Sequence, residues 1–445
     1  MDRSLLEKYG GPTPRYTSYP TAPHFHDGIG ADAYGDWLSA LGPEDGPVSL
    51  YLHIPYCREL CTYCGCNTKI TRRYAPVAEY VADLQAEIDL VGGHLSQPLA
   101  VSHVHFGGGT PNILASQDFL ALMGSLWRNF KFGPETETAV EIDPRLLTRD
   151  MAEAMAAGGV NRVSIGVQDL NEQVQEAINR VQPLEVVKMA VEHLRRAGIH
   201  NINLDLMYGL PLQTTDHVLS TVDQCVGLGA QRIALFGYAH VPWMKRHQRL
   251  VDDLPRADAD ERFEQAEAAA RRLADKGYRR VGLDHFAMPG DSLCRAQERG
   301  RLHRNFQGYT TDTAQVLLGF GVSAIGELAG GYVQNATDAG SYSRSIQAGQ
   351  FATVKGIAIS EEDRRRRGLI EKLMCDMAVD LDQFGGARLY AGELVRLHEM
   401  AGDGLVRVDG SRITVPEGAR PLIRAVAAVF DTYLRPAQGR HSMAV

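Results

Sequence analysis

The chain has 445 residues, enough for one large domain and a smaller one. Its hydrophobic content of 44% and charged content of 22% are ordinary for a soluble globular protein, and a formal net charge of -8 without a long basic run argues against a nucleic-acid-binding surface. Four of the seven cysteines lie within ten residues, and no signal-peptide-like segment opens the chain, which argues against a disulfide framework and for metal or redox chemistry in the cytoplasm.

The first 46 residues are predicted to form an N-terminal arm and not an independent fold. They are rich in proline, tyrosine and glycine, and they include the run Pro14-Arg-Tyr-Thr-Ser-Tyr-Pro20. Such a composition favours turns and extended chain over long helices.

A cysteine-rich loop follows the first predicted strand, residues 49–54. Cys57, Cys61 and Cys64 are spaced C-x3-C-x2-C, and three thiolates this close together can converge on one metal cluster. A cubane with only three protein thiolates leaves one iron open to a substrate. A structural zinc site would usually need a second pair of cysteines or histidines, and the sequence has no comparable pair. A zinc-binding structural protein therefore stays as the weaker alternative.

Strands and helices alternate along residues 47–300. Strands are predicted at 103–106 and 139–142, and from residue 151 onward a helix, a glycine stop and a strand recur. The predicted helices are 151–157, 187–197, 218–228 and 261–276, and the strands that follow them are 160–167, 199–207, 233–236 and 280–283. This order predicts a parallel sheet covered by helices, either a complete or partial (β/α) barrel or a doubly wound open sheet. In both folds, functional residues lie at the C-terminal ends of the strands.

The pattern changes after residue 300. Residues 301–355 are predicted to be a connecting segment near the active site, and residues 356–445 a helical C-terminal domain with a short β element at 405–415. Within the connecting segment, residues 316–333 are apolar but glycine-rich and contain Glu327, so they are too weak a candidate for a membrane span.

The spacing of Cys57, Cys61 and Cys64 matches the signature of the radical S-adenosylmethionine (SAM) superfamily. The resemblance implies a [4Fe-4S] cluster whose open iron is chelated by the methionine part of SAM. Electron transfer from the reduced cluster then cleaves SAM to a 5′-deoxyadenosyl radical, while the protein supplies orientation and exclusion of water.

Three further stretches resemble the oxygen-independent coproporphyrinogen III oxidases. These are residues 14–20, the extra cysteine Cys66, and His303-Arg-Asn-Phe-Gln-Gly-Tyr-Thr-Thr311; the resemblance runs from about residue 12 to about residue 435. It implies a partial parallel (β/α) barrel whose mouth is partly covered by the helical domain. It also implies oxidative decarboxylation of the propionates on rings A and B to vinyl groups, which converts coproporphyrinogen III to protoporphyrinogen IX. A haem chaperone or a radical methyltransferase on the same scaffold is the alternative.

The family is described as binding two SAM molecules side by side, and the resemblance carries their contacts onto this chain. The glycines of the run His105-Phe-Gly-Gly-Gly-Thr-Pro111 would let backbone amides approach a charged ligand. A carboxylate side chain suits ribose hydroxyls or an ammonium. An arginine, here Arg180 on a predicted helix, suits a ligand's carboxylate. The cluster-bound SAM is assigned Tyr51, Tyr63, Gly108, Glu141 and Ile325. The second SAM is assigned Gly109, Thr110, Gln168, Arg180, Asp205 and Ala239.

The remaining assignments concern Cys66 and the substrate. As a fourth ligand Cys66 would block the open iron, so it is assigned to proton or hydrogen delivery. Arg15, Arg304 and Gln307 lie in family-like segments and are the candidates for substrate carboxylates. The expected partners are a tetrapyrrole and an unidentified electron donor and acceptor, with no nucleic acid or membrane, and the chain is expected to act as a monomer.

Overall fold

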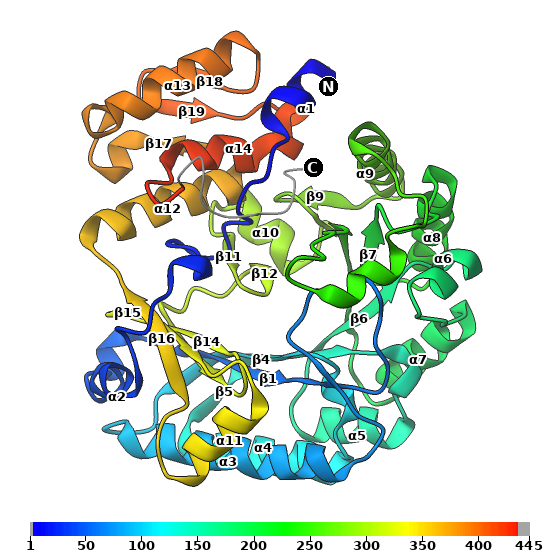
Figure 1. Ribbon diagram of the computed structural model, residues 1–445, viewed down its shortest axis with the longest axis vertical. Helices are drawn as coiled ribbons and strands as arrows, with labels where there is room; N and C mark the ends of the chain where they lie inside the picture. The colour runs from blue at the N-terminus through cyan, green and yellow to red at the C-terminus, as the bar shows by residue number, and fades with distance from the viewer. Residues whose placement is uncertain (1–2, 435–445) are drawn as a thin grey trace.

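A curled β-sheet is the core of the protein, whose computed structural model describes residues 3–434 (Figure 1). Within these residues the sheet has 12 strands, in the order β16 (Thr353–Ala358), β15 (Gly331–Asn335), β14 (Ile325–Leu328), β13 (Val316–Phe320), β1 (Val48–Ile54), β4 (Ala100–Gly108), β5 (Lys131–Ile142), β6 (Arg162–Gln168), β7 (Asn201–Tyr208), β8 (Arg232–Gly237), β10 (His285–Ala287) and β9 (Arg279–Val281). From β13 to β8 the neighbouring strands are parallel, as successive βα units require.

The two ends of the sheet are antiparallel and do not pair with each other in the described part of the chain. On one side β14, β15 and β16 extend the sheet from β13, and on the other β10 and β9 extend it from β8. The prediction of a partial parallel (β/α) barrel is thus confirmed. The structure adds that the predicted connecting segment supplies strands to this sheet, and that its apolar stretch forms β13 to β15.

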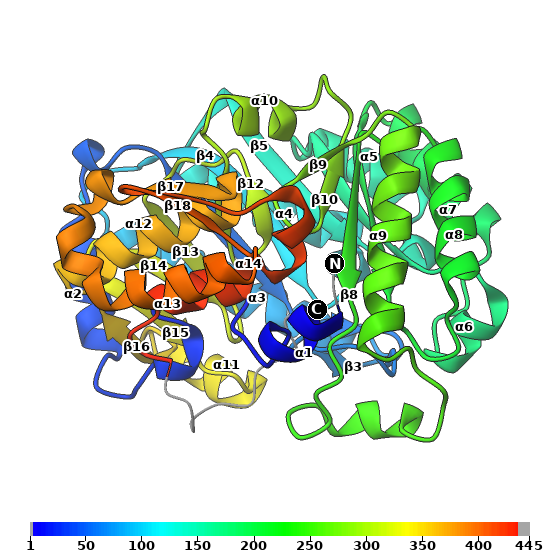
Figure 2. The same cartoon turned by 90° about the horizontal axis from the view of Figure 1, so that it is seen from above.

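Helices cover the outer face of the parallel strands, as Figures 1 and 2 show. They are α3 (Ala75–His94), α4 (Ser116–Asn129), α5 (Arg149–Ala157), α6 (Glu172–Ala177), α7 (Leu184–Arg196), α8 (Thr215–Gly227) and α9 (Ala259–Asp275). Helix α11 (Ala339–Gln347) packs against α3, and α10 (Ser292–Glu298) packs against β9 at the antiparallel end of the sheet. The predicted glycine stops are confirmed, because Gly159, Gly198, Gly229 and Gly277 have φ values of 81, 92, 67 and 90°.

The alternation of side chains along each strand separates core from site. In β1, Leu50, Leu52 and Ile54 are at most 1% exposed and belong to the hydrophobic core. The residues between them point to the other face, inside the barrel. Ser49 and Tyr51 there line a cavity of about 180 Å³ together with polar residues of β4 to β8. The inside of the barrel is therefore polar, because the strand residues that alternate with the core residues face it.

The C-terminal domain packs at one side of the barrel mouth (Figure 2). It consists of α12 (Glu361–Asp376), β17 (Ala378–Asp380), α13 (Ala391–Gly402), β18 (Arg407–Asp409), β19 (Arg412–Thr414) and α14 (Ile423–Ala427). The short strands form a separate sheet in the order β17-β19-β18, which confirms a mainly helical domain with a small β element.

The N-terminal arm contacts both the barrel, through its second helix, and this domain, through its earlier residues. It contains α1 (Arg3–Tyr9) and α2 (Ala31–Ser39). Tyr16 and Tyr19 are buried in the C-terminal domain's core, where their hydroxyls form hydrogen bonds with Asp431 (3.0 Å) and Thr432 (2.9 Å). The run at residues 14–20 thus joins the arm to the domain that borders the barrel mouth.

Among residues 3–434 the helices lack the combination of length and apolar character that a membrane crossing needs. The arm and C-terminal domain were predicted as residues 1–46 and 356–445, and of these, residues 1–2 and 435–445 lie outside the described residues.

Candidate active site

The cysteine loop leaves the sheet at the C-terminal end of β1. Its first cysteine ends β2 (Tyr56–Cys57), which pairs with β3 (Lys69–Ile70). Beside it, the backbone N–H groups of Gly109 and Thr110 donate to the carbonyls of Ile54 (2.8 Å) and Tyr56 (2.9 Å). A Cβ on Gly109 would lie 2.8 Å from those two oxygens, so only glycine permits this close approach. The glycine run and the cysteine loop are therefore positioned as one unit.

Two distant segments hold the backbone of this loop. The turn after α6 and the short helix Arg246–Val251 each supply partners for loop atoms. The contacts are Thr62 N to Ile178 O (3.0 Å), Asn179 Nδ2 to Leu60 O (2.7 Å), Gln248 Nε2 to Tyr63 O (2.8 Å), His247 Nε2 to Cys64 O (2.8 Å) and Lys245 Nζ to Cys66 O (2.7 Å). Backbone groups that are bonded in this way fix the directions of the cysteine side chains.

All four cysteines of the loop line one cavity of about 240 Å³ at the barrel mouth, and none of them is in a disulfide. Among the described residues, no three His, Cys, Asp or Glu side chains converge closely enough to hold a single metal ion. Thiols that surround a cavity suit a polynuclear cluster, whose irons are spread over a larger volume than one ion. The arrangement of Cys57, Cys61 and Cys64 around one cavity therefore fits a [4Fe-4S] cluster.

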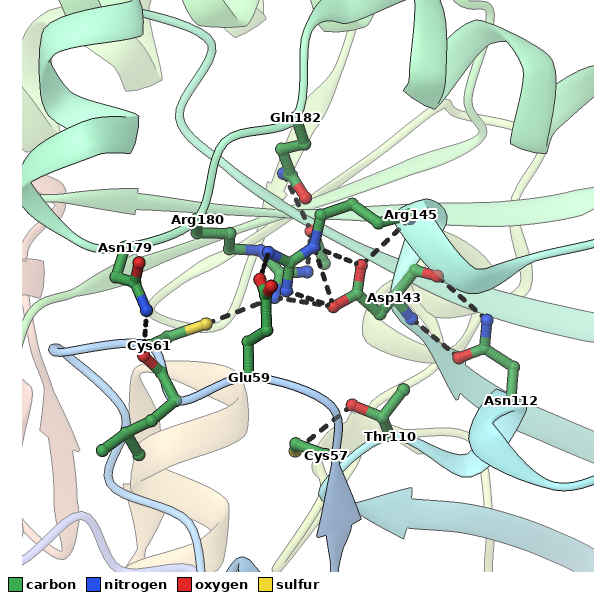
Figure 3. A network of polar contacts seen from close by, with 12 residues as sticks. Cys57, Glu59, Cys61, Thr110, Asn112, Asp143, Arg145, Asn179, Arg180 and Gln182 are labelled. Carbon is green, nitrogen blue, oxygen red and sulfur yellow. Dashed lines mark hydrogen bonds and ion pairs between the residues drawn. The ribbon is translucent and has the colours of Figure 1, made fainter. Parts of the chain in front are cut away.

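Each of these three sulfurs has a polar neighbour, and Figure 3 shows those of Cys57 and Cys61. Thr110 Oγ1 lies 3.3 Å from Cys57 Sγ, an Arg180 nitrogen lies 3.6 Å from Cys61 Sγ, and the Cys66 N–H lies 3.4 Å from Cys64 Sγ. Hydrogen bonding from Cys66 lowers the pKa of Cys64 to about 6, whereas burial raises the pKa of Cys57 to about 11. Hydrogen bonds of this kind stabilise thiolates and tune the potential of a bound cluster.

An ionic group of which only Arg180 was predicted from the sequence forms one wall of the cavity (Figure 3). Asp143 accepts from Arg145 (2.6 Å) and Arg180 (3.2 Å), and Arg145 also reaches Glu59 (3.2 Å). Burial opposes the ionisation of Asp143, but the charges of the two arginines keep its pKa below the usual value. The position of Asp143 directly after strand β5 is a signal that could have identified it.

Arg180 itself lies after a helix and not on one, contrary to the sequence prediction. Helix α6 ends at Ala177, and Asn179 has a φ of 52°, a left-handed conformation that ends the helix. The Arg180 side chain then turns inward, where Nη2 donates to the carbonyl of Gly166 (2.7 Å). Its Nε is buried without a hydrogen-bond partner among the described residues, as expected of a donor that awaits a ligand's oxygen.

Glu141 connects the glycine run to two histidines. It accepts from His105 Nε2 (2.9 Å) and from the Gly108 N–H (3.3 Å), and a Cβ on Gly108 would lie 2.5 Å from the His53 ring. Burial opposes ionisation of Glu141, but the hydrogen bond from His105 holds its pKa below the usual value. The cavity therefore presents an ionised carboxylate at the end of β5.

Two further predicted residues enter the cavity from β6 and β7. Asp205 accepts from Ser164 Oγ and from Asn203 Nδ2, each at 2.7 Å, and burial raises its pKa to about 6. Gln168 has a φ of 67°, a strained conformation for a residue with a side chain, and it lines the cavity. Strain of this kind is found where a functional side chain must be aimed.

The structure brings most of the predicted cofactor contacts together. One cavity with the cysteines is lined by Tyr63, Gly108, Gly109, Thr110, Glu141, Gln168, Arg180 and Asp205. Tyr51 lines the adjoining barrel-interior cavity, where its hydroxyl lies 3.0 Å from His53 Nδ1, and Gln307 lines this same cavity. Both cavities share Glu141 and Asp205.

The other predicted residues lie apart from the cysteines. Ala239, Arg15 and Arg304 line a third cavity beside β8. Ile325 begins β14 and packs against the hydrophobic cluster of Phe25, without lining any of these three cavities. The division of the contacts between two SAM molecules, and the substrate contacts, stay predictions.

Comparisons with known proteins agree along the whole chain. The model of the radical SAM superfamily matches residues 51–225. The chain is 49% identical over its full length to the oxygen-independent coproporphyrinogen III oxidase of Bradyrhizobium diazoefficiens, of which it covers 100%, and 38% identical to that of Escherichia coli, with 98% of this chain and 96% of that protein covered. The solved structure of coproporphyrinogen III oxidase from Escherichia coli, described as a radical SAM enzyme, matches with a TM-score of 0.89 at 37% identity and covers 97% of this chain and 99% of that one. The likeness spans the arm, the barrel and the C-terminal domain together.

Proposed function

Because the chain belongs to the oxygen-independent coproporphyrinogen III oxidases of the radical SAM superfamily, we propose that it converts coproporphyrinogen III to protoporphyrinogen IX by oxidative decarboxylation of two propionates. It is a radical SAM oxidoreductase of porphyrin and haem biosynthesis that uses a [4Fe-4S] cluster and SAM. The observation that carries this function is the single cavity in which the loop cysteines meet the glycine run and the polar ends of β5 to β7.

The protein's own residues bind and orient the reactants. Cys57, Cys61 and Cys64 would hold three irons of the cluster and leave the fourth for the methionine end of SAM. When bound there, the cluster and SAM would supply a 5′-deoxyadenosyl radical for removal of a hydrogen atom from the propionate carbon attached to the pyrrole. Loss of CO₂ from that propionate, with one electron passed to an acceptor, would give the vinyl group.

The side chains around the cluster loop would divide two SAM molecules between them. Tyr51, Tyr63, Gly108, Glu141 and Ile325 would serve the first, and Gly109, Thr110, Gln168, Arg180, Asp205 and Ala239 the second. Arg180 supports this division because it carries a buried, unbonded Nε toward the cavity, where a carboxylate could accept it. Asp205 and Glu141 are acceptors for ribose hydroxyls or an ammonium.

Cys66 and three residues farther from the cluster would act on the substrate. Cys66 is exposed beside the cluster ligands, and hydrogen bonding to Cys64 raises its pKa well above the usual value, so it is held as a neutral thiol that could deliver a proton or hydrogen atom. Arg15, Arg304 and Gln307 would meet the substrate's carboxylates. We further propose a monomer in the cytoplasm with an unidentified electron donor and acceptor; the free thiols of the described residues suit a reducing compartment.

The test is anaerobic reconstitution with iron and sulfide, followed by incubation with reductant, SAM and coproporphyrinogen III. Vinyl-containing products, formed together with 5′-deoxyadenosine, are the expected result. Formation of 5′-deoxyadenosine without vinyl products would remove the substrate assignment and leave the radical chemistry standing. Retention of haem without turnover would favour a haem chaperone, and a methylated product would favour a methyltransferase.

A further inference from the structure

We call the cavity of about 240 Å³ that the loop cysteines line the cofactor cavity. A third cavity, of about 380 Å³, lies beside it and is lined by residues from all parts of the chain. It lies where the arm and α14 approach α9 and β9 (Figures 1 and 2). Its cationic residues are Arg15 of the arm, Arg256 before α9, Arg262 on α9, Arg280 on β9, Arg304 on β11 (His303–Asn305) and Arg424 on α14. We call it the arginine cavity.

The charges in the arginine cavity are only partly balanced by carboxylates of the described residues. Arg256 and Arg280 have carboxylate partners in Asp252 (3.7 Å) and Glu267 (2.9 Å). Within residues 3–434, Arg15, Arg262 and Arg304 form no ion pair. The one carboxylate that lines the cavity, Asp284, accepts a hydrogen bond from His285 (2.7 Å). Burial opposes its ionisation, but this hydrogen bond and the charges of Arg304 and Arg15 lower its pKa to about 2, so one carboxylate faces several cations.

Arg262 is held in place by neutral groups. It donates to the carbonyl of Tyr238 (2.9 Å), and its guanidinium lies 5.6 Å from the centre of the Tyr208 ring. Burial lowers its pKa, and repulsion from Arg15 adds to the effect. A half-buried guanidinium that is oriented but not neutralised is preorganised for an anion that comes from outside.

The remaining walls of the cavity are apolar and lead toward the cofactors. Leu235, Phe263, Leu283 and Phe286 supply flat or aliphatic surface, which suits a pyrrole-based ring better than a small anion. Phe236, in β8, lines the arginine cavity, the barrel-interior cavity and the cofactor cavity alike. A single molecule can therefore have one edge among the arginines and another edge beyond Phe236, near the cysteines.

We propose that Arg262, with Arg15, Arg304 and Arg424 around it, binds the propionate carboxylates that the reaction leaves intact, while the reacting propionate extends past Phe236 into the cofactor cavity. This assignment rests on the proposed function. An arginine ion pair stabilises a carboxylate as it is, so on the reacting group it would oppose the loss of CO₂. On a retained carboxylate the same ion pair contributes equally before and during the reaction, and so it positions the substrate without slowing it.

The test compares Arg262→Gln and Arg15→Gln with the wild-type holoenzyme in steady-state assays with coproporphyrinogen III. For Arg262→Gln, we expect KM for coproporphyrinogen III to rise about 10- to 100-fold, as for loss of a hydrogen bond to a charged group, with a smaller change in kcat. Arg262→Lys should recover part of the loss, because it keeps the charge but not the planar fork. The matched control is Arg271→Gln on the same helix, an exposed residue paired with Glu264, whose KM should equal that of wild type.

Three outcomes would overturn the assignment. A wild-type KM in Arg262→Gln and Arg15→Gln, with the cluster absorbance and unfolding midpoint intact, would show that the arginines do not bind substrate. A raised KM for SAM alone would assign the cavity to the second SAM. With the three-propionate intermediate as substrate, disappearance of the Arg262→Gln defect would show that the bound carboxylate is one that reacts. If the wild-type enzyme forms no vinyl product at all, the proposed function itself fails, which none of these variants can mimic.

Discussion

Phe236 lines both the cofactor cavity and the arginine cavity, but the two cavities differ in how their charged side chains are paired. In the cofactor cavity the charged side chains are bonded to one another: Asp143 to Arg145 and Arg180, and Glu141 to His105. In the arginine cavity, Arg15, Arg262 and Arg304 have no ion pair among the described residues. Burial, with repulsion from Arg15, lowers the pKa of Arg424 there to about 10. Charge is thus balanced within one cavity and left in excess in the other.

The difference reflects what each cavity binds. A cluster and SAM bring metal, thiolate bonds and a sulfonium, so their cavity needs fixed ligands and a protein charge that is neutral overall. A ligand with several carboxylates brings its own negative charge, so its cavity can leave cations unpaired until that ligand arrives. Mutations should consequently act on cluster assembly and stability in the first cavity, and on substrate affinity in the second.

The largest contrast is expected from the cysteines. Cys57→Ser, Cys61→Ser or Cys64→Ser should each abolish the cluster's visible absorbance after anaerobic reconstitution, and SAM cleavage with it, because a hydroxyl does not replace a thiolate ligand. Arg262→Gln should keep the full absorbance. The measurement is iron and sulfide content together with the absorption spectrum.

Cys66→Ser is the matched control within the same loop. It should retain iron and absorbance, since Cys66 is assigned outside the ligand set. Loss of the cluster in this variant would make Cys66 a ligand and would remove its role in proton or hydrogen delivery. Loss of the cluster in Arg262→Gln would show that the arginine cavity also affects cluster assembly, contrary to the proposed division of roles between the two cavities.

The second contrast concerns stability. Asp143→Asn should destabilise the protein by about 3–5 kcal/mol, because it removes the carboxylate shared by the buried Arg180 and the partly buried Arg145. Arg15→Gln in the arginine cavity should change stability by less than about 0.5 kcal/mol, because its exposed charge is unpaired and repels its neighbours. Urea unfolding of matched anaerobic preparations measures both.

An exposed ion pair is the control for the Asp143 variant. Arg149 and Glu153 on α5 lie 2.7 Å apart with side chains 75% and 53% exposed, so Glu153→Ala should cost no more than about 1 kcal/mol. If Asp143→Asn costs as little as Glu153→Ala, the ionic wall of the cofactor cavity does not stabilise the fold.

The two cavities also differ in how many of their residues could be predicted from the sequence. The cysteine loop is readable because its ligands lie within eight residues, and the glycine run because it follows a strand directly. The helix–glycine–strand order gave the parallel sheet, since the left-handed conformation at Gly159 or Gly198 is a local property of the chain. Local spacing therefore predicted most of the cofactor cavity.

The arginine cavity could not be predicted in the same way. Its cations come from residues 15 to 424, and no spacing relates Arg262 to Arg15 or Arg424 before the arm packs on the C-terminal domain. Of the arginine substrate candidates, Arg15 and Arg304 were found because they lie in family-like segments. Arg180 was expected on a helix, because a single positive φ at Asn179 is not visible in a helical pattern.

The smallest effect is expected from Asp205, the carboxylate of the cofactor cavity that has hydroxyl and amide partners but no ion pair among the described residues. Burial raises its pKa to about 6, above the value of 3.8 for an unfolded chain. Between these two values the folded state holds a proton that the unfolded state has released. The resulting stability is fully present below about pH 3.8 and is lost as the pH rises through about 6.

Relative to Asp205→Asn, the wild-type protein should therefore gain about 1 kcal/mol as the pH falls from about 7 to about 5, measured by urea unfolding of the cluster-free protein. The asparagine variant removes the titration and keeps the side chain's size, so other acidic groups cancel in the comparison. Saturating SAM should shift this gain to lower pH if Asp205 accepts hydrogen bonds from its ribose, because a bound donor favours the ionised carboxylate. A pH dependence that is the same in both proteins would mean that Asp205 is neutralised by a cation, as Asp143 is. Asp205 would then not be open to a ligand, and the contrast in charge between the two cavities would rest on the arginines alone.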